Sequence, residues 1–124
     1  MPVLVMNQEL NDRYQNLAVD ALHRGLVGFK MVDQQGDMHI SSAELLEAFQ
    51  VSGDILRSNR ERDCILVSAE SVFTNCIYLA RCLYFPAEAR VLVLNGDEHL
   101  LDAEGQVENL RRNMGHLHEL LDNR

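Results

Sequence analysis

The chain has 124 residues, of which 47% are hydrophobic and 24% are charged. This is the size of a single domain, and the composition is that of a globular protein rather than a disordered one. We therefore expect residues 1–124 to form one globular domain. The formal net charge of −8 makes the average surface repel nucleic acid and anionic membranes.

The N-terminus and the cysteines both favour a cytoplasmic protein. The opening residues lack the basic segment of a signal peptide, and no apolar run approaches the roughly 20 residues that cross a membrane. Cys64, Cys76 and Cys82 lie in apolar stretches without a C-x-x-C spacing, which is typical of buried, reduced thiols. We expect a cytoplasmic protein with no membrane partner.

The first third of the chain predicts one helix among short strands. Residues 8–23 carry apolar side chains at helical spacing, and Gly25 suits the left-handed position that follows a helix. Three short apolar segments favour β-strands. They are residues 3–6, 26–32 and 38–40, the last two joined by a hairpin turn at 33–37.

The next stretch predicts two short helices. Ser41 and Glu44 form a capping box, in which the Ser side chain satisfies a free amide at the start of a helix. That helix would turn Leu45, Leu46 and Phe49 inward. Val51-Ser52-Gly53 would interrupt it, and a second helix would run from Asp54 to about Arg60.

The following segment predicts a βαβ unit. Residues 64–67 and 90–94 are continuous apolar runs with β-branched members, the pattern of strands buried on both faces. Residues 69–85 between them predict a helix that Pro86 ends. The expected fold class is α+β, or small α/β. It has a mixed sheet of four to five short strands with this βαβ unit, flanking helices and a long C-terminal helix.

The last segment predicts that long helix, because its apolar residues repeat at alternating steps of three and four. This heptad seam consists of Leu100, Ala103, Val107, Leu110, Met114, Leu117 and Leu121. The seam can pack against the rest of its own domain, or it can pair with a second copy of the chain. Sequence alone leaves both alternatives open.

Two local resemblances bear on function. Residues 44–62 resemble the helix-turn-helix of bacterial and phage regulators, which implies that Ser52 caps a second helix presenting Arg57, Asn59 and Arg60 to DNA. Leu46 and Gln50 depart from that pattern. Residues 33–44 resemble a calcium-binding EF-hand loop, but Met38 stands where the loop needs Gly. A hairpin followed by a capped helix explains the same residues.

Catalytic and metal-binding patterns are missing from the sequence. His116 and His118 are two residues apart, so on a helix they point away from each other. No nucleophile elbow, phosphate-binding loop or zinc-protease motif occurs. We therefore expect no enzyme, no metal site and no cofactor.

The function that these observations favour is protein binding. We expect a non-catalytic interaction module, such as a small regulator, inhibitor or immunity-type protein. Its partner would be another protein, or a second copy in a homodimer, bound through Leu110, Met114, Leu117 and Leu121. The alternative is a nucleic-acid-binding regulator that uses residues 44–62.

Overall fold

The computed structural model describes residues 2–25, 40–84 and 103–124, which form helices and no strand. The helices are α1 (Pro2–Arg24), α2 (Ser42–Ser58), α3 (Asp63–Tyr84) and α5 (Ala103–Asp122). The predicted α+β fold is therefore wrong for this part of the chain. The predicted strands 26–32 and 90–94, the hairpin turn at 33–37, residues 38 and 39 of the predicted strand 38–40, and Pro86 lie outside the described residues.

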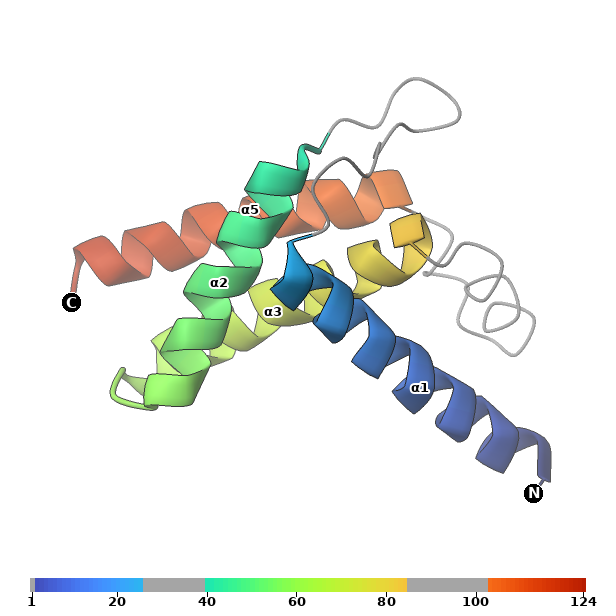
Figure 1. The fold of residues 1–124 in the computed structure, drawn as a ribbon. Helices are drawn as coiled ribbons and strands as arrows, with labels where there is room; N and C mark the ends of the chain where they lie inside the picture. Colours follow the sequence, from blue (N-terminus) through green and yellow to red (C-terminus); the bar gives the residue numbers. More distant parts are fainter. Residues whose placement is uncertain (1, 26–39, 85–102) are drawn as a thin grey trace.

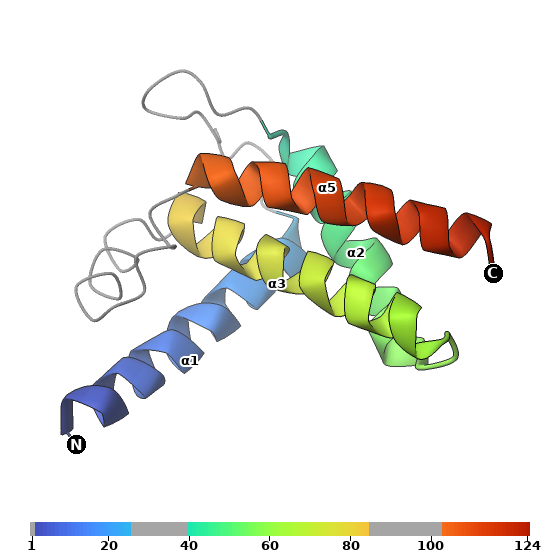
Figure 2. The same ribbon diagram turned by 180° about the vertical axis from the view of Figure 1, so that it is seen from behind.

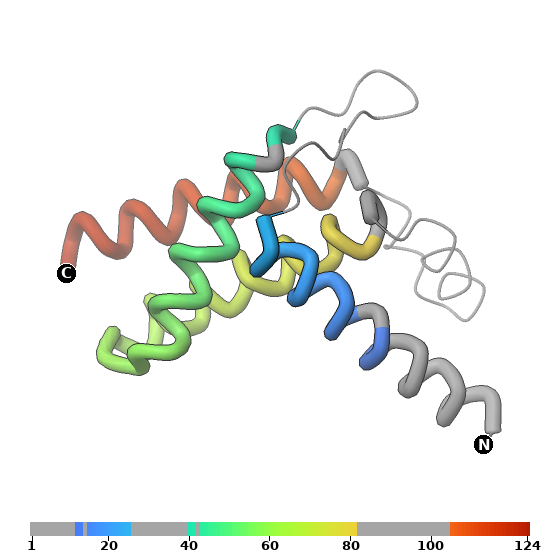
Figure 3. Tube along the Cα trace, viewed as in Figure 1, coloured from blue at the N-terminus to red at the C-terminus, as the bar shows by residue number. Residues whose placement is uncertain are grey.

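The helices are arranged around α3. It contacts α1, α2 and α5, and α1 also contacts α2. Figure 2 shows α5 running alongside α3, whereas in Figure 1 α2 crosses in front of both. The tube in Figure 3 shows the same crossing along the Cα trace. The described helices all contribute to one apolar core, whose largest fully buried side chains are Leu22, Leu45, Ile65, Val72, Leu79, Leu110 and Leu117.

Residues 64–67 are the start of α3 and not a strand, so the predicted βαβ unit is wrong at its first element. Ile65 is fully buried, while Cys64 is exposed and Val67 is 63% exposed. The buried face continues through Ala69, Val72, Cys76 and Ala80, with helical spacing. This long apolar face outweighs the weak strand preference of four residues.

Residues 3–6 are likewise helical, because α1 begins at Pro2. Proline suits the first turn of a helix, where its missing N–H would have no partner. The predicted helix over residues 8–23 is confirmed. So is the role of Gly25, which follows α1 with a positive φ of 57° and donates its amide to the Leu22 carbonyl.

α2 is one continuous helix, so the predicted interruption at residues 51–53 is wrong. Ser52 is fully buried, and its hydroxyl donates to the carbonyl of Ala48 at 2.7 Å and contacts that of Phe49 at 3.2 Å. A serine whose hydroxyl bonds back into its own helix needs no break. The helix start is confirmed, since the Ser41 side chain accepts a hydrogen bond from the Glu44 amide at 3.0 Å.

The C-terminal helix is confirmed as α5, and its seam packs inside this chain. Val107, Leu110 and Leu117 are at most 3% exposed, and Met114 and Leu121 pack partly buried against the same core. Because α5 contacts α3 and lies alongside it in Figure 2, the seam completes the core of this chain. In this structure the seam therefore packs against the rest of its own domain, which is the first of the two alternatives that the sequence leaves open.

α3 also has the length and composition of a membrane-spanning helix. The stretch Asp63–Arg81 has a mean hydropathy of 1.2 over 19 residues, so the expectation that no such run exists is wrong. Half of this stretch is buried within the chain. The central core helix of a globular protein passes the same test, and by itself this finding indicates no location.

Candidate binding site

A cavity of about 470 Å³ opens where α1, α2 and α3 meet. α2 supplies most of its lining, and α1 and α3 contribute the remaining residues. The lining residues are Leu22, His23, Phe49, Gln50, Gly53, Asp54, Leu56, Arg57 and Phe73. The volume falls within the roughly 300–1,000 Å³ typical of ligand pockets.

Aromatic rings form one wall of this cavity. The rings of Phe49 and Phe73 stack, with centroids 5.0 Å apart and an angle of 27° between their planes. The His23 ring meets Phe49 edge-on, with centroids 5.1 Å apart at 77°. Both geometries are favourable for aromatic pairs. Because the three rings come from three different helices, the wall is fixed by the packing of the bundle.

Gly53 leaves room in the cavity, because it places no side chain in front of Phe73. A Cβ atom on Gly53 would lie 3.7 Å from the Phe73 ring, an ordinary van der Waals contact. Because both residues line the cavity, a larger side chain at this position would press against the Phe73 ring and change the shape of the cavity. Glycine within a helix costs roughly 0.5–1 kcal/mol relative to alanine, so opening this space carries a cost in helix stability.

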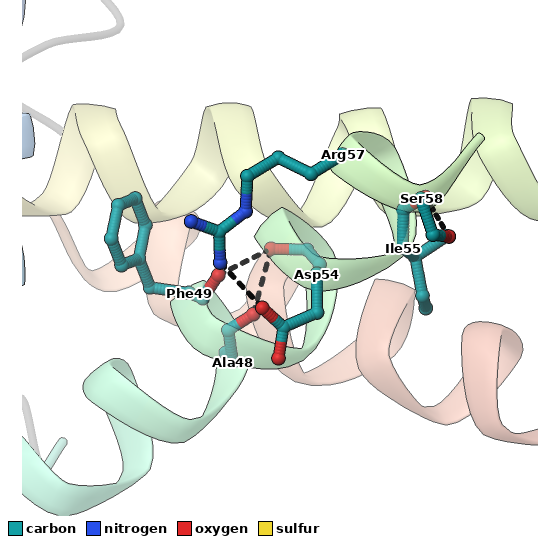
Figure 4. A network of polar contacts seen from close by, with 7 residues as sticks. Ala48, Phe49, Asp54, Ile55, Arg57 and Ser58 are labelled. Atoms are coloured by element: carbon teal, nitrogen blue, oxygen red, sulfur yellow. Dashed lines mark hydrogen bonds and ion pairs between the residues drawn. The ribbon is translucent and has the colours of Figure 1, made fainter.

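Charged side chains lie at the rim of the cavity. Figure 4 shows the Arg57 guanidinium directed back along α2 toward Asp54, with which it forms an ion pair. The two side chains are 70% and 71% exposed. Exposed ion pairs contribute at most about 1 kcal/mol, so either charge can change its partner at little cost. The cavity therefore combines apolar walls with charges that are accessible at its edge.

The residues of the predicted helix-turn-helix do not form that motif. Ser52 lies inside α2 and caps no helix, and Arg57 is paired with Asp54. Asn59 ends α2 in the left-handed conformation, with φ 51°, and Arg60 is exposed in the connection to α3. The geometry that the resemblance implied for these residues is absent. Nucleic-acid binding as such stays a prediction.

The predicted partner-binding residues are gathered on the inner face of α5. Leu110 and Leu117 are 1% and 0% exposed. A partner could reach these two side chains only if α5 separated from α3. Met114 and Leu121 are partly buried beside them. Protein binding through these four residues stays a prediction.

The thiols differ in environment. Cys64 is exposed, which corrects the expectation of a buried side chain, whereas Cys76 is buried. Removal from water raises the pKa of the Cys76 thiol to about 12, while its hydrogen bonding to the backbone acts weakly in the opposite direction. Cys76 is therefore protonated at neutral pH and is a poor nucleophile. The side chain of Cys82 lies outside the described set.

A second, polar hollow of about 420 Å³ lies over α3 and α5. Here the Asn75 side-chain amide donates to Gln106 at 3.0 Å, and the Asn113 amide donates to Asn75 at 2.7 Å. Asn75 and Gln106 are each 8% exposed. Because these amides satisfy one another, the arrangement fixes the register of α5 against α3 rather than leaving groups for a ligand.

The structure gives no support to the EF-hand resemblance at Glu44, the last residue of the proposed loop. Asp33, Gln35 and Asp37 lie outside the described residues. The Glu44 carboxylate instead accepts two hydrogen bonds from Arg111 of α5, at 2.9 and 3.2 Å. Within the part of the chain that the structure describes, no cluster of three His, Cys, Asp or Glu side chains could hold a metal ion.

Comparisons with known proteins identify no relative. No protein-family model matches the chain, and neither the curated proteins nor the solved structures contain a match. A proposal about function therefore rests on the geometry of the described residues.

Proposed function

We propose that this protein is a non-catalytic protein-binding module whose partner inserts an apolar side chain into the cavity between α1, α2 and α3. One observation carries the proposal: the cavity has stacked aromatic walls and an exposed ion pair at its edge. Protein interfaces concentrate their binding energy where a large side chain of one partner fills such a pocket.

The chemistry of the lining favours recognition over catalysis. Its aromatic and aliphatic side chains offer contact surface, and its two opposite charges neutralise each other. The buried thiol of Cys76 lies in the core and its raised pKa keeps it protonated. A binding surface requires shape and polarity at its edge, and the cavity supplies both.

A peptide library displayed on phage tests this proposal. The library is selected in parallel on the wild-type chain and on Gly53→Leu, whose side chain would press against Phe73 and change the shape of the cavity that both residues line. Gly53→Ala is the matched control, since its Cβ makes only an ordinary contact. Because alanine favours a helix over glycine, this control should be more stable by about 0.5–1 kcal/mol.

We expect peptides that share a consensus to bind the wild type and Gly53→Ala but not Gly53→Leu. Circular dichroism of the three proteins checks that each is folded. Peptides that bind all three proteins equally would place the binding surface elsewhere. A selection that yields no consensus on the wild type would contradict protein binding at this cavity.

A further inference from the structure

We propose that a second hollow, between α2 and α5, is a docking site for an arginine side chain of a protein partner. The hollow lies where α2 crosses α5 in Figure 1, and it measures about 280 Å³. It shares no lining residue with the cavity between α1, α2 and α3. Because it is smaller than the roughly 300–1,000 Å³ of most ligand pockets, it suits a single side chain. The proposal therefore goes beyond the proposed function and concerns a separate surface.

The buried part of the lining of this hollow is apolar. Ala48 and Leu110 are at most 2% exposed, and Met114 packs partly buried against the core. Arginine and lysine side chains bury their alkyl stems along apolar surfaces of this kind and keep their charged ends in water. The unbranched side chain of methionine adapts to different neighbours. The floor of the hollow therefore suits the stem of a long basic side chain.

The charged part of the lining has an excess of one carboxylate. Glu44 of α2 accepts two hydrogen bonds from the Arg111 guanidinium of α5, at 2.9 and 3.2 Å, so these two charges cancel. Glu47 lies about one turn further along α2, is exposed, and forms no ion pair with any residue that the structure describes. His118 also lines the hollow, and a neutral imidazole can accept a hydrogen bond from a cation. The hollow is therefore complementary to one positive charge.

Gly115 leaves open the position from which α5 could supply a second cation. It lies four residues after Arg111, so the two positions are on the same side of α5. It lines the hollow together with Glu47, and a Cβ atom on it would meet nothing within 4 Å. Glycine weakens a helix relative to alanine, and no described residue lies close enough to require glycine here. The space beside Glu47 is therefore open to a side chain from another molecule.

The pair of Glu44 and Arg111 indicates how such a side chain would bind. In this pair an arginine reaches from one helix to a carboxylate of another and donates to it through two nitrogens. A partner arginine would repeat this contact at Glu47, with its stem over Gly115 and Met114. Arginine is favoured over lysine, because its planar guanidinium donates two parallel hydrogen bonds to a carboxylate, whereas lysine acts as a point charge.

The experiment titrates the peptide acetyl-Ala-Arg-Ala-amide into the ¹⁵N-labelled full-length chain and follows the backbone amide signals by NMR. The titrations are run at pH 7.5, where histidine is ordinarily neutral. We expect the signals of Glu47 and Gly115 to shift and to saturate, with a Kd below about 20 mM. Citrulline in place of arginine keeps the shape without the charge and should bind at least about tenfold more weakly. Lysine keeps the charge without the planar fork and should bind at least about threefold more weakly.

Four variants locate the contact. Glu47→Gln should weaken binding of the arginine peptide at least about tenfold. Glu70→Gln removes the same charge from an exposed position on α3 and should leave binding unchanged. Gly115→Arg should prevent binding, because its own guanidinium would fill the hollow and pair with Glu47, whereas Gly115→Ala should bind as the wild type does. Circular dichroism checks that each variant is folded.

Several outcomes would overturn the proposal. Equal weakening by Glu47→Gln and Glu70→Gln would mean that the peptide responds only to the net charge of the chain. Equal binding of the citrulline or lysine peptide, or shifts that do not saturate, would also contradict an arginine site. Spermidine that binds at least about tenfold more tightly than the arginine peptide, and depends on Glu47, would assign the hollow to a free polyamine instead. The variant Gly53→Leu alters only the other cavity, so failure of the first proposal leaves these titrations unchanged.

Discussion

α3 meets its neighbours in two different ways. Toward α5 it forms an interface that is closed along its apolar seam, and the polar hollow of about 420 Å³ above the seam is lined in part by Asn75 and Asn113, whose side-chain amides bond each other. Toward α1 and α2 it leaves a cavity of about 470 Å³ between aromatic rings. A closed interface stabilises a fold, whereas an open apolar cavity leaves surface available for binding. The difference separates the interface that maintains the bundle from the cavity that we propose as a binding site.

The largest expected effect is on the closed side. Leu117→Ala should lower the free energy of unfolding by about 2–5 kcal/mol, because it leaves a hole in the packed core. Leu117 is fully buried. Urea denaturation measures the loss, and the exposed neighbour His116→Ala should stay within about 0.5 kcal/mol of the wild type.

The same variant also tests the role of the α5 seam. Sedimentation equilibrium gives the mass of the wild type and of Leu117→Ala. If Leu117→Ala kept its stability while a dimer became a monomer, the seam would be an interface between copies. The conclusion that α3 and α5 form a closed interface within one chain would then be wrong.

A smaller effect is expected from the paired amides. Asn75→Ala removes the group that bonds both Gln106 and Asn113, and a buried polar group without a partner costs about 1–3 kcal/mol. The exposed neighbour Thr74→Ala is the control. In a double-mutant cycle, Gln106→Ala should lower the free energy of unfolding less in the Asn75→Ala variant than in the wild type. Additive losses would show that the two amides are independent.

The smallest effect is a dependence of stability on pH. Burial raises the pKa of Cys76 to about 12, against 9.0 for an exposed thiol. Below pH 9 the thiol is protonated in both states and contributes no slope. Above pH 9 the Cys76 thiol loses its proton in the unfolded chain but keeps it in the folded chain. The free energy of unfolding should therefore fall by roughly 1 kcal/mol per pH unit until about pH 12.

Urea denaturation at pH 8 and pH 10 measures this slope. Cys76→Ala removes the thiol, so its stability should fall less between the two values than that of the wild type. The difference between the slopes isolates Cys76 from other groups that titrate there. Identical slopes would show that the folded and unfolded chains ionise this thiol alike.

Local signals correctly predicted the start of α2, the end of α1 and the helical character of the α5 segment. Ser41 caps α2, Gly25 follows α1 with positive φ, and the regular apolar repeat marks α5. Each signal depends on residues within a few positions of one another, or on a repeat sustained over several turns. These features can therefore be predicted from the sequence before any tertiary contact is known.

The candidate site was largely hidden from sequence reasoning. Phe49 was expected to point inward, but its stacking on Phe73 joins residues of different helices. The sequence predicts a helix break at Gly53, whereas in the structure this residue lies within α2 and borders the cavity. The usable signal was the helical spacing of Leu45, Phe49, Ser52 and Leu56, which continues through the supposed break.

The sequence by itself determined the helix caps, the periodic C-terminal helix and the acidic charge of the chain, since these depend on local spacing and composition. Only the tertiary structure decided that residues 64–67 are helical, that the α5 seam is buried, and that three rings form one wall of a cavity. The reason is physical: a short apolar run suits a strand or a buried helix equally well. The choice between them depends on the long-range packing that surrounds it.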